Sequence, residues 1–179
     1  MYGSEATAGH AMTSATIRRL LGSQVQCVLA TVCPQTRAPS THLMAFAVAA
    51  DLRRVFLATE GKTQKAENMR RSPAVSLLWD DRTGQLEDHA GGTLCTVSGT
   101  ARLLSSSRGG GGASESEEAR DAMLAANPNF SSFMASPSIA LFAVDVSHYD
   151  LVVGYGSPVR WDPSDQDSTA RGPGLASSL

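Results

Sequence analysis

The sequence predicts a single mainly β domain, a small antiparallel barrel that carries a few helices. Three observations lead to this prediction: six apolar runs read as strands, the turns between successive runs are short, and few segments have a helical pattern. Short turns join antiparallel neighbours, which favours a barrel over a doubly wound parallel sheet. The expected strands cover residues 25–33, 39–50, 53–59, 74–79, 93–104 and 139–154.

Three helices are expected around these strands. Residues 14–22 have a threonine-serine start, an apolar stripe and a terminal glycine. Residues 62–71 form a short basic helix that ends before Pro73, because the residue before a proline avoids the helical conformation. The third helix, residues 116–126, ends at Asn127-Pro128.

The domain is predicted to span residues 13–161. Residues 1–12 are expected to be a flexible tail, and residues 107–116 a flexible Gly-rich connection. Residues 162–179 are rich in Pro, Gly, Ser and Asp, which predicts a disordered tail.

Composition narrows the class of protein. The chain has 179 residues, 42% of them hydrophobic, which suits one domain with a substantial core. The net charge of −2 gives no general attraction to nucleic acid. No apolar run is long enough to cross a bilayer, and the N-terminus has no signal-peptide pattern. The three cysteines, an odd number in strand-like segments, predict free thiols and a cytoplasmic protein.

The stretch "FLATEGKTQKAENMRRSPAVSLLW", residues 56–79, holds the most distinctive chemistry. Its Gly61-Lys62-Thr63 resembles the end of a P-loop, but that motif needs a glycine where Phe56 stands. A helix that begins near Thr63 would still present free N–H groups and the positive end of its dipole. An anion bound there would also need side-chain donors, because the dipole contributes only about 0.3–1 kcal/mol. The alternative is a solvated basic helix that binds nothing.

The order of four segments is similar to that in the pyridoxamine 5′-phosphate oxidase-like group of FMN-binding split barrels. These segments are "VLATV", "PSTHLMAF", "VFLATEGKTQKAENMRRSPAVSLLW" and "TVSGTARL", and a looser similarity continues through "FMASPSIALFAVDVSHYDLV". The resemblance implies a six-stranded antiparallel split β-barrel, a homodimer, and FMN in a cleft between the subunits.

The resemblance also implies a set of cofactor-binding residues. Thr59, Thr63 and Lys65 correspond to phosphate donors, and two arginines of the family are replaced by His42 and Gln64. Because neither replacement offers the bidentate, permanent charge of arginine, Lys62 would have to compensate. The strand that meets the flavin and its ribityl chain contributes His42, Leu43 and Met44, and Thr93 is expected near the flavin of the partner subunit.

Arg82 lies in the polar loop "WDDRTGQLEDHAGG". It would either reach a flavin or substrate anion across the subunit interface, or pair with Asp80 or Asp81 on the surface. His89 in the same loop does not predict a metal site, because three adjacent polar residues rarely converge on one ion.

The function implied by the resemblance is that of an FMN-dependent oxidoreductase acting on an unknown small molecule, and His42 is the only histidine placed for acid–base chemistry. Arg160 and Trp161 do not reproduce the C-terminal motif with which pyridoxamine phosphate oxidases bind substrate phosphate. Oxidation of vitamin B6 compounds is therefore not expected.

Two alternatives remain. The barrel could be a non-catalytic carrier or sensor for haem, deazaflavin or FMN, with His42 or His148 as the axial ligand in the haem case. It could also hold no cofactor and act through a partner protein.

Overall fold

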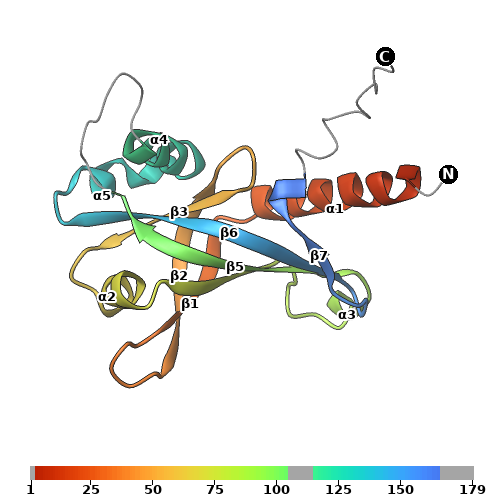
Figure 1. Ribbon diagram of the computed structural model, residues 1–179, viewed down its shortest axis with the longest axis horizontal. Helices are drawn as coiled ribbons and strands as arrows, with labels where there is room; N and C mark the ends of the chain where they lie inside the picture. Colours follow the sequence, from red (N-terminus) through yellow and green to blue (C-terminus); the bar gives the residue numbers. More distant parts are fainter. Residues whose placement is uncertain (1–2, 105–114, 166–179) are drawn as a thin grey trace, which may run out of the picture.

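The chain folds as a closed six-stranded antiparallel β-barrel, as predicted (Figure 1). A computed structural model describes residues 3–104 and 115–165. The strands follow one another in the order β3-β2-β1-β4-β5-β6, and pairing between β3 and β6 closes the barrel. Their bounds are Gln26–Val32 for β1, Pro39–Val48 for β2, Arg54–Glu60 for β3, Ala74–Asp80 for β4, Thr93–Leu103 for β5 and Ile139–Val153 for β6.

Inward-facing side chains, which alternate with outward-facing ones along most strands, fill the interior of the barrel. Phe46 and Trp79 are almost fully buried, and their rings meet edge to face with centroids 5.1 Å apart. Large aromatic side chains such as these contribute most to the apolar area buried in a core. The rest of this inner core includes Cys27, Leu29, Leu57, Leu77, Cys95, Val97, Phe142 and Tyr149.

A second apolar cluster lies on the outside of the barrel, under α4 (Glu115–Ala126) and α5 (Ser131–Ala135). Phe56 on β3 and Ala143 on β6 belong to it, together with Met123 of α4. Because these helices cover the outer face, β3 and the first half of β6 are apolar at consecutive positions. The second half of β6 has no such cover and returns to alternation.

The first helix, α1 (Gly3–Ser23), is much longer than predicted. The expected stripe of Ile17, Leu20 and Leu21 is buried against the barrel. The expectation of a flexible tail over residues 1–12 is wrong for residues 3–12, which continue the helix. This part lacks an apolar stripe, but the His10 ring packs on Trp161 with centroids 5.3 Å apart. A contact between distant segments therefore supports a helix that local pattern did not indicate.

The chain after β6 is also more ordered than expected. A seventh strand, β7 (Val159–Trp161), pairs with the end of β6, and the short helix η2 (Pro163–Asp165) follows with Pro163 buried. The disordered tail predicted from residue 162 is therefore wrong for residues 162–165, and residues 166–179 lie outside the described part.

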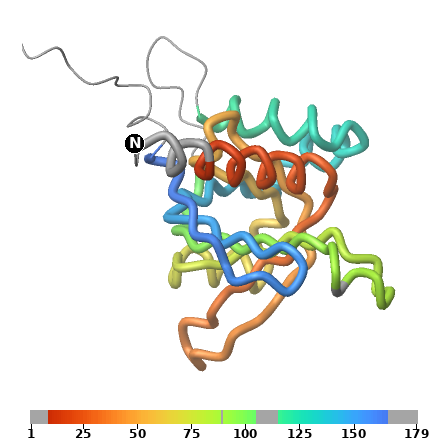
Figure 2. The backbone as a smooth tube through the Cα atoms, turned by 90° about the vertical axis from the view of Figure 1, so that its right-hand side faces the viewer, coloured from red at the N-terminus to blue at the C-terminus, as the bar shows by residue number. Residues whose placement is uncertain are grey.

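The remaining helices are short connections. The basic helix α2 (Gln64–Arg71) follows β3, and α3 (Asp88–Gly91) precedes β5. The helix η1 (Pro128–Phe130) joins α4 to α5. Figure 2 shows α1 and α4 on one side of the barrel and the β1–β2 hairpin projecting on the other. Residues 107–114 of the predicted Gly-rich connection are outside the described part, whereas residues 115 and 116 begin α4. No helix among the described residues is long and apolar enough to span a membrane.

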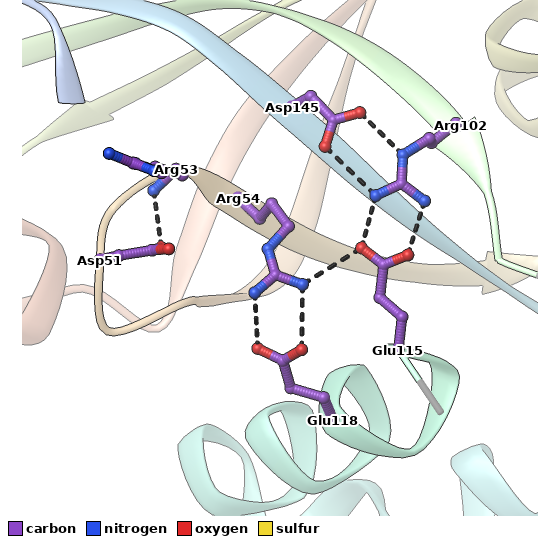
Figure 3. Close-up of polar contacts among 7 residues, drawn as sticks. All are labelled: Asp51, Arg53, Arg54, Arg102, Glu115, Glu118 and Asp145. Atoms are coloured by element: carbon purple, nitrogen blue, oxygen red, sulfur yellow. Dashed lines mark hydrogen bonds and ion pairs between the residues drawn. The ribbon is translucent and has the colours of Figure 1, made fainter. Parts of the chain in front are cut away.

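An ion-pair cluster holds the start of α4 to the barrel (Figure 3). Arg102 on β5 donates to Glu115 and, at 2.7 Å, to Asp145 on β6. Arg54 on β3 donates to Glu115 at 3.1 Å and to both carboxylate oxygens of Glu118 at 2.9 Å. Hydrogen bonds from Arg102, and then from Arg54, hold the pKa of Glu115 below its usual value although partial burial opposes the shift. The ionised carboxylate therefore stabilises the docked helix.

Replacing Glu115 with glutamine should lower the free energy of unfolding at pH 7 by about 1 kcal/mol, because the pairs are partly exposed. Glu115 has a lower pKa in the folded state than in the unfolded state, so its contribution is present above the unfolded pKa of about 4.3. This contribution should disappear as the pH falls through the folded value. Urea unfolding of both proteins from pH 7 to pH 3 measures the difference. An Asp121→Asn control on the same helix should show a smaller difference at pH 7, and a constant gap for Glu115→Gln would contradict the assignment.

Candidate functional site

The candidate site lies where β3 turns into α2. Thr63 caps the helix: its hydroxyl oxygen accepts the N–H of Ala66 at 3.4 Å and its hydroxyl donates to the Glu60 carbonyl at 2.9 Å. The cap leaves the other N–H groups of the first helical turn without intrahelical acceptors. A threonine at this position is therefore the local reason that the helix begins here.

Two hydroxyl groups lie together at this helix start, and a lysine belongs to its first turn. The buried Thr59 at the end of β3 has its Oγ1 3.4 Å from Thr63 Oγ1. Lys65 is partly buried in the first turn, whereas Lys62 is exposed before the helix. The structure thus brings together three of the residues that the resemblance assigns to a phosphate group. Such a set of donors fits an anion.

The turn itself is held by two hydrogen bonds. The N–H of Gly61 donates to the Ser138 carbonyl at 2.8 Å, and Arg70 Nη1 donates to the Gly61 carbonyl at 2.8 Å. A side chain at position 61 would place its Cβ 3.1 Å from the Ser138 oxygen. Glycine therefore permits this close approach between the turn and the segment that leads into β6.

A chain of polar side chains ties α2 to the barrel beneath it. Asn68, fully buried on α2, donates to Thr31 Oγ1 at 3.0 Å and accepts from Gln64 Nε2 at 2.8 Å. Thr31 Oγ1 lies 3.1 Å from Ser40 Oγ and 3.4 Å from His42 Nε2. This chain connects Gln64 with His42, the two residues that replace arginines of the family.

His42 is a neutral group in this network. Partial burial, and then the positive charge of Lys65, lower the pKa of His42 below its ordinary value of about 6.5. Its Nε2 lies 3.2 Å from Ser40 Oγ. The imidazole can therefore donate or accept a hydrogen bond near neutral pH but adds no positive charge, and Gln64 is neutral as well. The permanent positive charge at the start of α2 therefore has to come from other residues, among them Lys65 in the first helical turn.

The next two predicted residues on β2 face opposite sides of the strand. Met44 points into the barrel and is 4% exposed, whereas Leu43 is on the outer surface and is 65% exposed. Leu43 lies opposite Val28, which in turn lies opposite Leu78, so that an apolar row crosses the outside of three strands. A single ligand cannot contact both the Leu43 and the Met44 side chains, and Met44 can contribute only through its backbone.

Arg82 and Thr93 are not brought to this site within one chain. They lie at the far end of β4 and the start of β5, near α3, whereas α2 is at the opposite end (Figure 1). Arg82 pairs with Asp80 through two hydrogen bonds of 2.8 Å. The N–H of Thr93 donates to Asp81 at 2.6 Å, and its side chain is buried. Any contact of these residues with a shared ligand requires a second subunit.

The other candidate residues have local partners. His148 Nε2 is 3.4 Å from Asp150, which also accepts two hydrogen bonds from Arg160 at 2.9 and 3.0 Å. Among the described residues no group of three metal-ligating side chains is close enough to hold an ion. The His89 side chain lies outside the described part. The three cysteines are free, and Cys33, at the end of β1, is only half-buried.

Sequence reasoning missed three residues of the network, namely Thr31, Ser40 and Asn68. One signal for Asn68 was available, because it lies between Ala66 and Met69 on the buried face of a short helix. A polar residue at such a position needs a buried partner. The partner, Thr31, is 37 residues away in sequence, and only the fold reveals it.

A hollow beside β2 is separate from this site. It has a volume of about 480 Å³ and lies between the end of α1, the second half of β2 and the end of α4. Leu21, Phe46 and Asn127 contribute to its wall, and none of the predicted binding residues does. This hollow therefore offers none of the predicted phosphate donors.

Comparison with solved structures supports the fold. The haem-binding protein from Mycobacterium smegmatis has a TM-score of 0.68 and 17% identity, over 84% of this chain and 58% of that one. The haem storage protein HutZ from Vibrio cholerae has a TM-score of 0.59 and 16% identity, over 80% of this chain and 95% of that one. A putative pyridoxamine 5′-phosphate oxidase from Listeria innocua has a TM-score of 0.56 and 19% identity, over 79% of this chain and 97% of that one. At these identities the similarity concerns the fold alone.

Comparison with protein families shows to which family the chain belongs. No curated protein matches the sequence. The family described as pyridoxamine 5′-phosphate oxidase matches residues 13–152, which include the whole barrel apart from the last residue of β6. This match covers well over half of the 179 residues. The chain therefore belongs to the pyridoxamine 5′-phosphate oxidase-like family of split-barrel proteins.

Proposed function

We propose that this protein binds FMN with the phosphate at the start of α2, and that it is an FMN-dependent oxidoreductase for a small molecule. The observation that supports this proposal best is that the Thr59 and Thr63 hydroxyls lie 3.4 Å apart at the helix N-terminus whose first turn contains Lys65. Family membership supports it as well, because the resemblance implies phosphate donors at these three positions.

Each residue has a defined part in holding the phosphate. The Lys65 ammonium supplies the positive charge and the Thr59 hydroxyl supplies a neutral donor. The Thr63 hydroxyl donates to the phosphate in exchange for its bond to the Glu60 carbonyl. The first-turn N–H groups add the helix dipole, worth about 0.3–1 kcal/mol. His42, neutral near pH 7, donates a hydrogen bond rather than a charge. When bound, the flavin supplies the redox chemistry, and the polypeptide anchors and orients it.

We also propose that the protein is a homodimer whose two subunits share each FMN site. The apolar row of Val28, Leu43 and Leu78 on the outer barrel face offers a surface for a second copy. A second copy would allow Arg82 and Thr93, distant from α2 in one chain, to approach the flavin of its partner. Since all three cysteines are free, we place the protein in the reducing cytoplasm.

Substituting Lys65 by alanine should weaken FMN binding roughly 10- to 100-fold, because a hydrogen bond to a charged group contributes about 1.5–3 kcal/mol. Fluorescence titration of FMN with each protein measures the dissociation constant, and light scattering on the same samples gives the mass expected of a dimer. Arg71→Ala is the matched control, since it removes one positive charge from the same helix at a side chain that is 62% exposed and paired with Glu67.

The outcomes separate the parts of the proposal. Equal FMN affinity in Lys65→Ala and the wild type would show that the phosphate is not held at the start of α2. A wild-type protein that does not quench FMN fluorescence would end the proposal for FMN itself. A monomeric mass with retained FMN binding would contradict only the shared site.

Haem is the second candidate ligand, because two solved structures with this fold are of a haem-binding and a haem storage protein. An intense Soret band after addition of haemin, at one haem per chain, would support it. Loss of that band in His42→Ala but not in His148→Ala, or the reverse, would identify the axial ligand. If the protein binds neither FMN nor haem, the remaining alternative is a barrel that holds no cofactor and acts through a partner protein.

A further inference from the structure

A second polar hollow lies behind the candidate site, on the side of α2 that faces α4. It has a volume of about 310 Å³ and is formed by the β3–α2 turn, the end of β5, the start of β6 and α4. Arg70 and Arg120 line it from two different helices, and Ser116 and Ser138 contribute hydroxyl groups. Ligand sites in proteins commonly have volumes of about 300–1,000 Å³. The hollow is therefore large enough for a small metabolite.

Both guanidinium groups are held in place by backbone carbonyls. Arg70 Nη1 donates to the Gly61 carbonyl at 2.8 Å, and the guanidinium lies over the Phe142 ring, 5.8 Å from its centroid. Arg120 Nη1 donates to the Met134 carbonyl. A guanidinium has five N–H donors in a planar fork, so each group has further donors for a ligand. Preorganised arginines of this kind favour carboxylate or phosphate.

Two acidic groups lie near the hollow, each with a partner of its own. Glu67 lies 3.9 Å from Arg70 but only 2.5 Å from Arg71, so its charge is directed mainly to the latter. Glu60 accepts a hydrogen bond from Ser138 at 3.0 Å. Of the ion pairs formed within residues 3–104 and 115–165, none includes Arg120. Within the described residues, Arg120 thus lies at the wall of a concave surface and belongs to no ion pair.

We propose that this hollow binds a small organic anion, with its carboxylate or phosphate group between Arg70 and Arg120. The apolar part of the ligand packs on Leu104 and Leu141, which form the apolar part of the wall. The site is distinct from the FMN site, because neither Thr59, Thr63 nor Lys65 lines it. The two sites share only the turn at Gly61, whose N–H and carbonyl are bound by Ser138 and Arg70.

Phenyl phosphate and benzoate are suitable probes, because each joins an anionic group to one apolar ring. Isothermal titration calorimetry of the wild-type protein should give one site per chain with a dissociation constant of about 1 mM or below. Arg120→Gln should weaken binding at least roughly tenfold, as expected for loss of a charged hydrogen bond. Arg120→Lys should restore part of it. Stronger binding of one probe identifies phosphate or carboxylate as the preferred group.

Two controls make the assignment specific. Arg71→Gln removes an arginine of the same helix that does not line the hollow, and it should leave the affinity unchanged. Lys65→Ala removes the main cation of the FMN site and should also leave probe binding unchanged. Thermal unfolding of each variant verifies that it is folded.

The proposal is overturned if neither probe binds the wild type at about 10 mM, or if Arg120→Gln binds as well as the wild type. It is also overturned if binding is lost in Lys65→Ala and kept in Arg120→Gln, because the probes would then occupy the start of α2. Failure of FMN to bind would not affect this result, so the two proposals fail independently.

Discussion

Replacing Gly99 with alanine is expected to lower the free energy of unfolding by about 2–3 kcal/mol, as overpacking of a close contact does. Gly99 is buried on β5 where the register with β6 shifts by one residue. A Cβ atom there would lie 2.6 Å from the Asp145 carbonyl oxygen and 2.7 Å from a methyl group of Val144. The nearest neighbour is backbone, so it cannot rotate away, and the two longest strands of the barrel would have to separate.

Chemical unfolding of the variant and the wild type measures this effect. Gly22→Ala is the matched control, because Gly22 lies in α1 and a Cβ there meets nothing within 4 Å. That change should be neutral or stabilise by up to about 1 kcal/mol, since alanine is the better helix former. Equal stability of Gly99→Ala and the wild type would mean that β5 and β6 do not approach so closely at the bulge.

The second large effect is expected at the buried contact between Asn68 and Thr31. Asn68→Leu should lower the free energy of unfolding by about 1–3 kcal/mol, because it removes the amide that binds Thr31 and leaves polar groups without partners. The polar chain ends at Gln64 and His42 beside the helix start, so FMN affinity should fall along with stability.

A double-mutant cycle with Thr31→Val isolates the pair. The 3.0 Å distance indicates that the two side chains interact. The double variant should then lose less free energy of unfolding than the two single variants lose together, by about 0.5–3 kcal/mol. Urea unfolding gives the four free energies. Strict additivity would show that the contact contributes nothing to holding α2 on the barrel, and an unchanged FMN affinity would show that the network has no part in binding.

Apolar runs separated by short turns allowed the barrel to be predicted from sequence. The runs that became β1 to β6 differ from the observed strands by only a few residues at their ends, because an apolar run and the turn that ends it are local signals. The start of α2 was also predicted near Thr63, since a cap acts within one helical turn. The candidate anion site follows from these two local features, and Thr59, Thr63 and Lys65 are neighbours in sequence as well as in space.

Other parts depended on contacts between distant segments. The N-terminal half of α1 packs its His10 ring on Trp161, and β7 forms only because the end of β6 offers a partner. A three-residue strand has too weak a local pattern to be predicted, and a helix without an apolar stripe reads as a tail.

The sequence by itself determined the family, the six strands and the position of the basic helix, because periodicity and turn chemistry act over a few residues. Only the tertiary structure decided which polar groups meet. It joined Asn68 to Thr31 and brought Arg120 to the same hollow as Arg70. It also separated Arg82 and Thr93 from the start of α2. Hydrogen bonds and ion pairs act over a few ångströms, so which side chains form them depends on how the barrel closes.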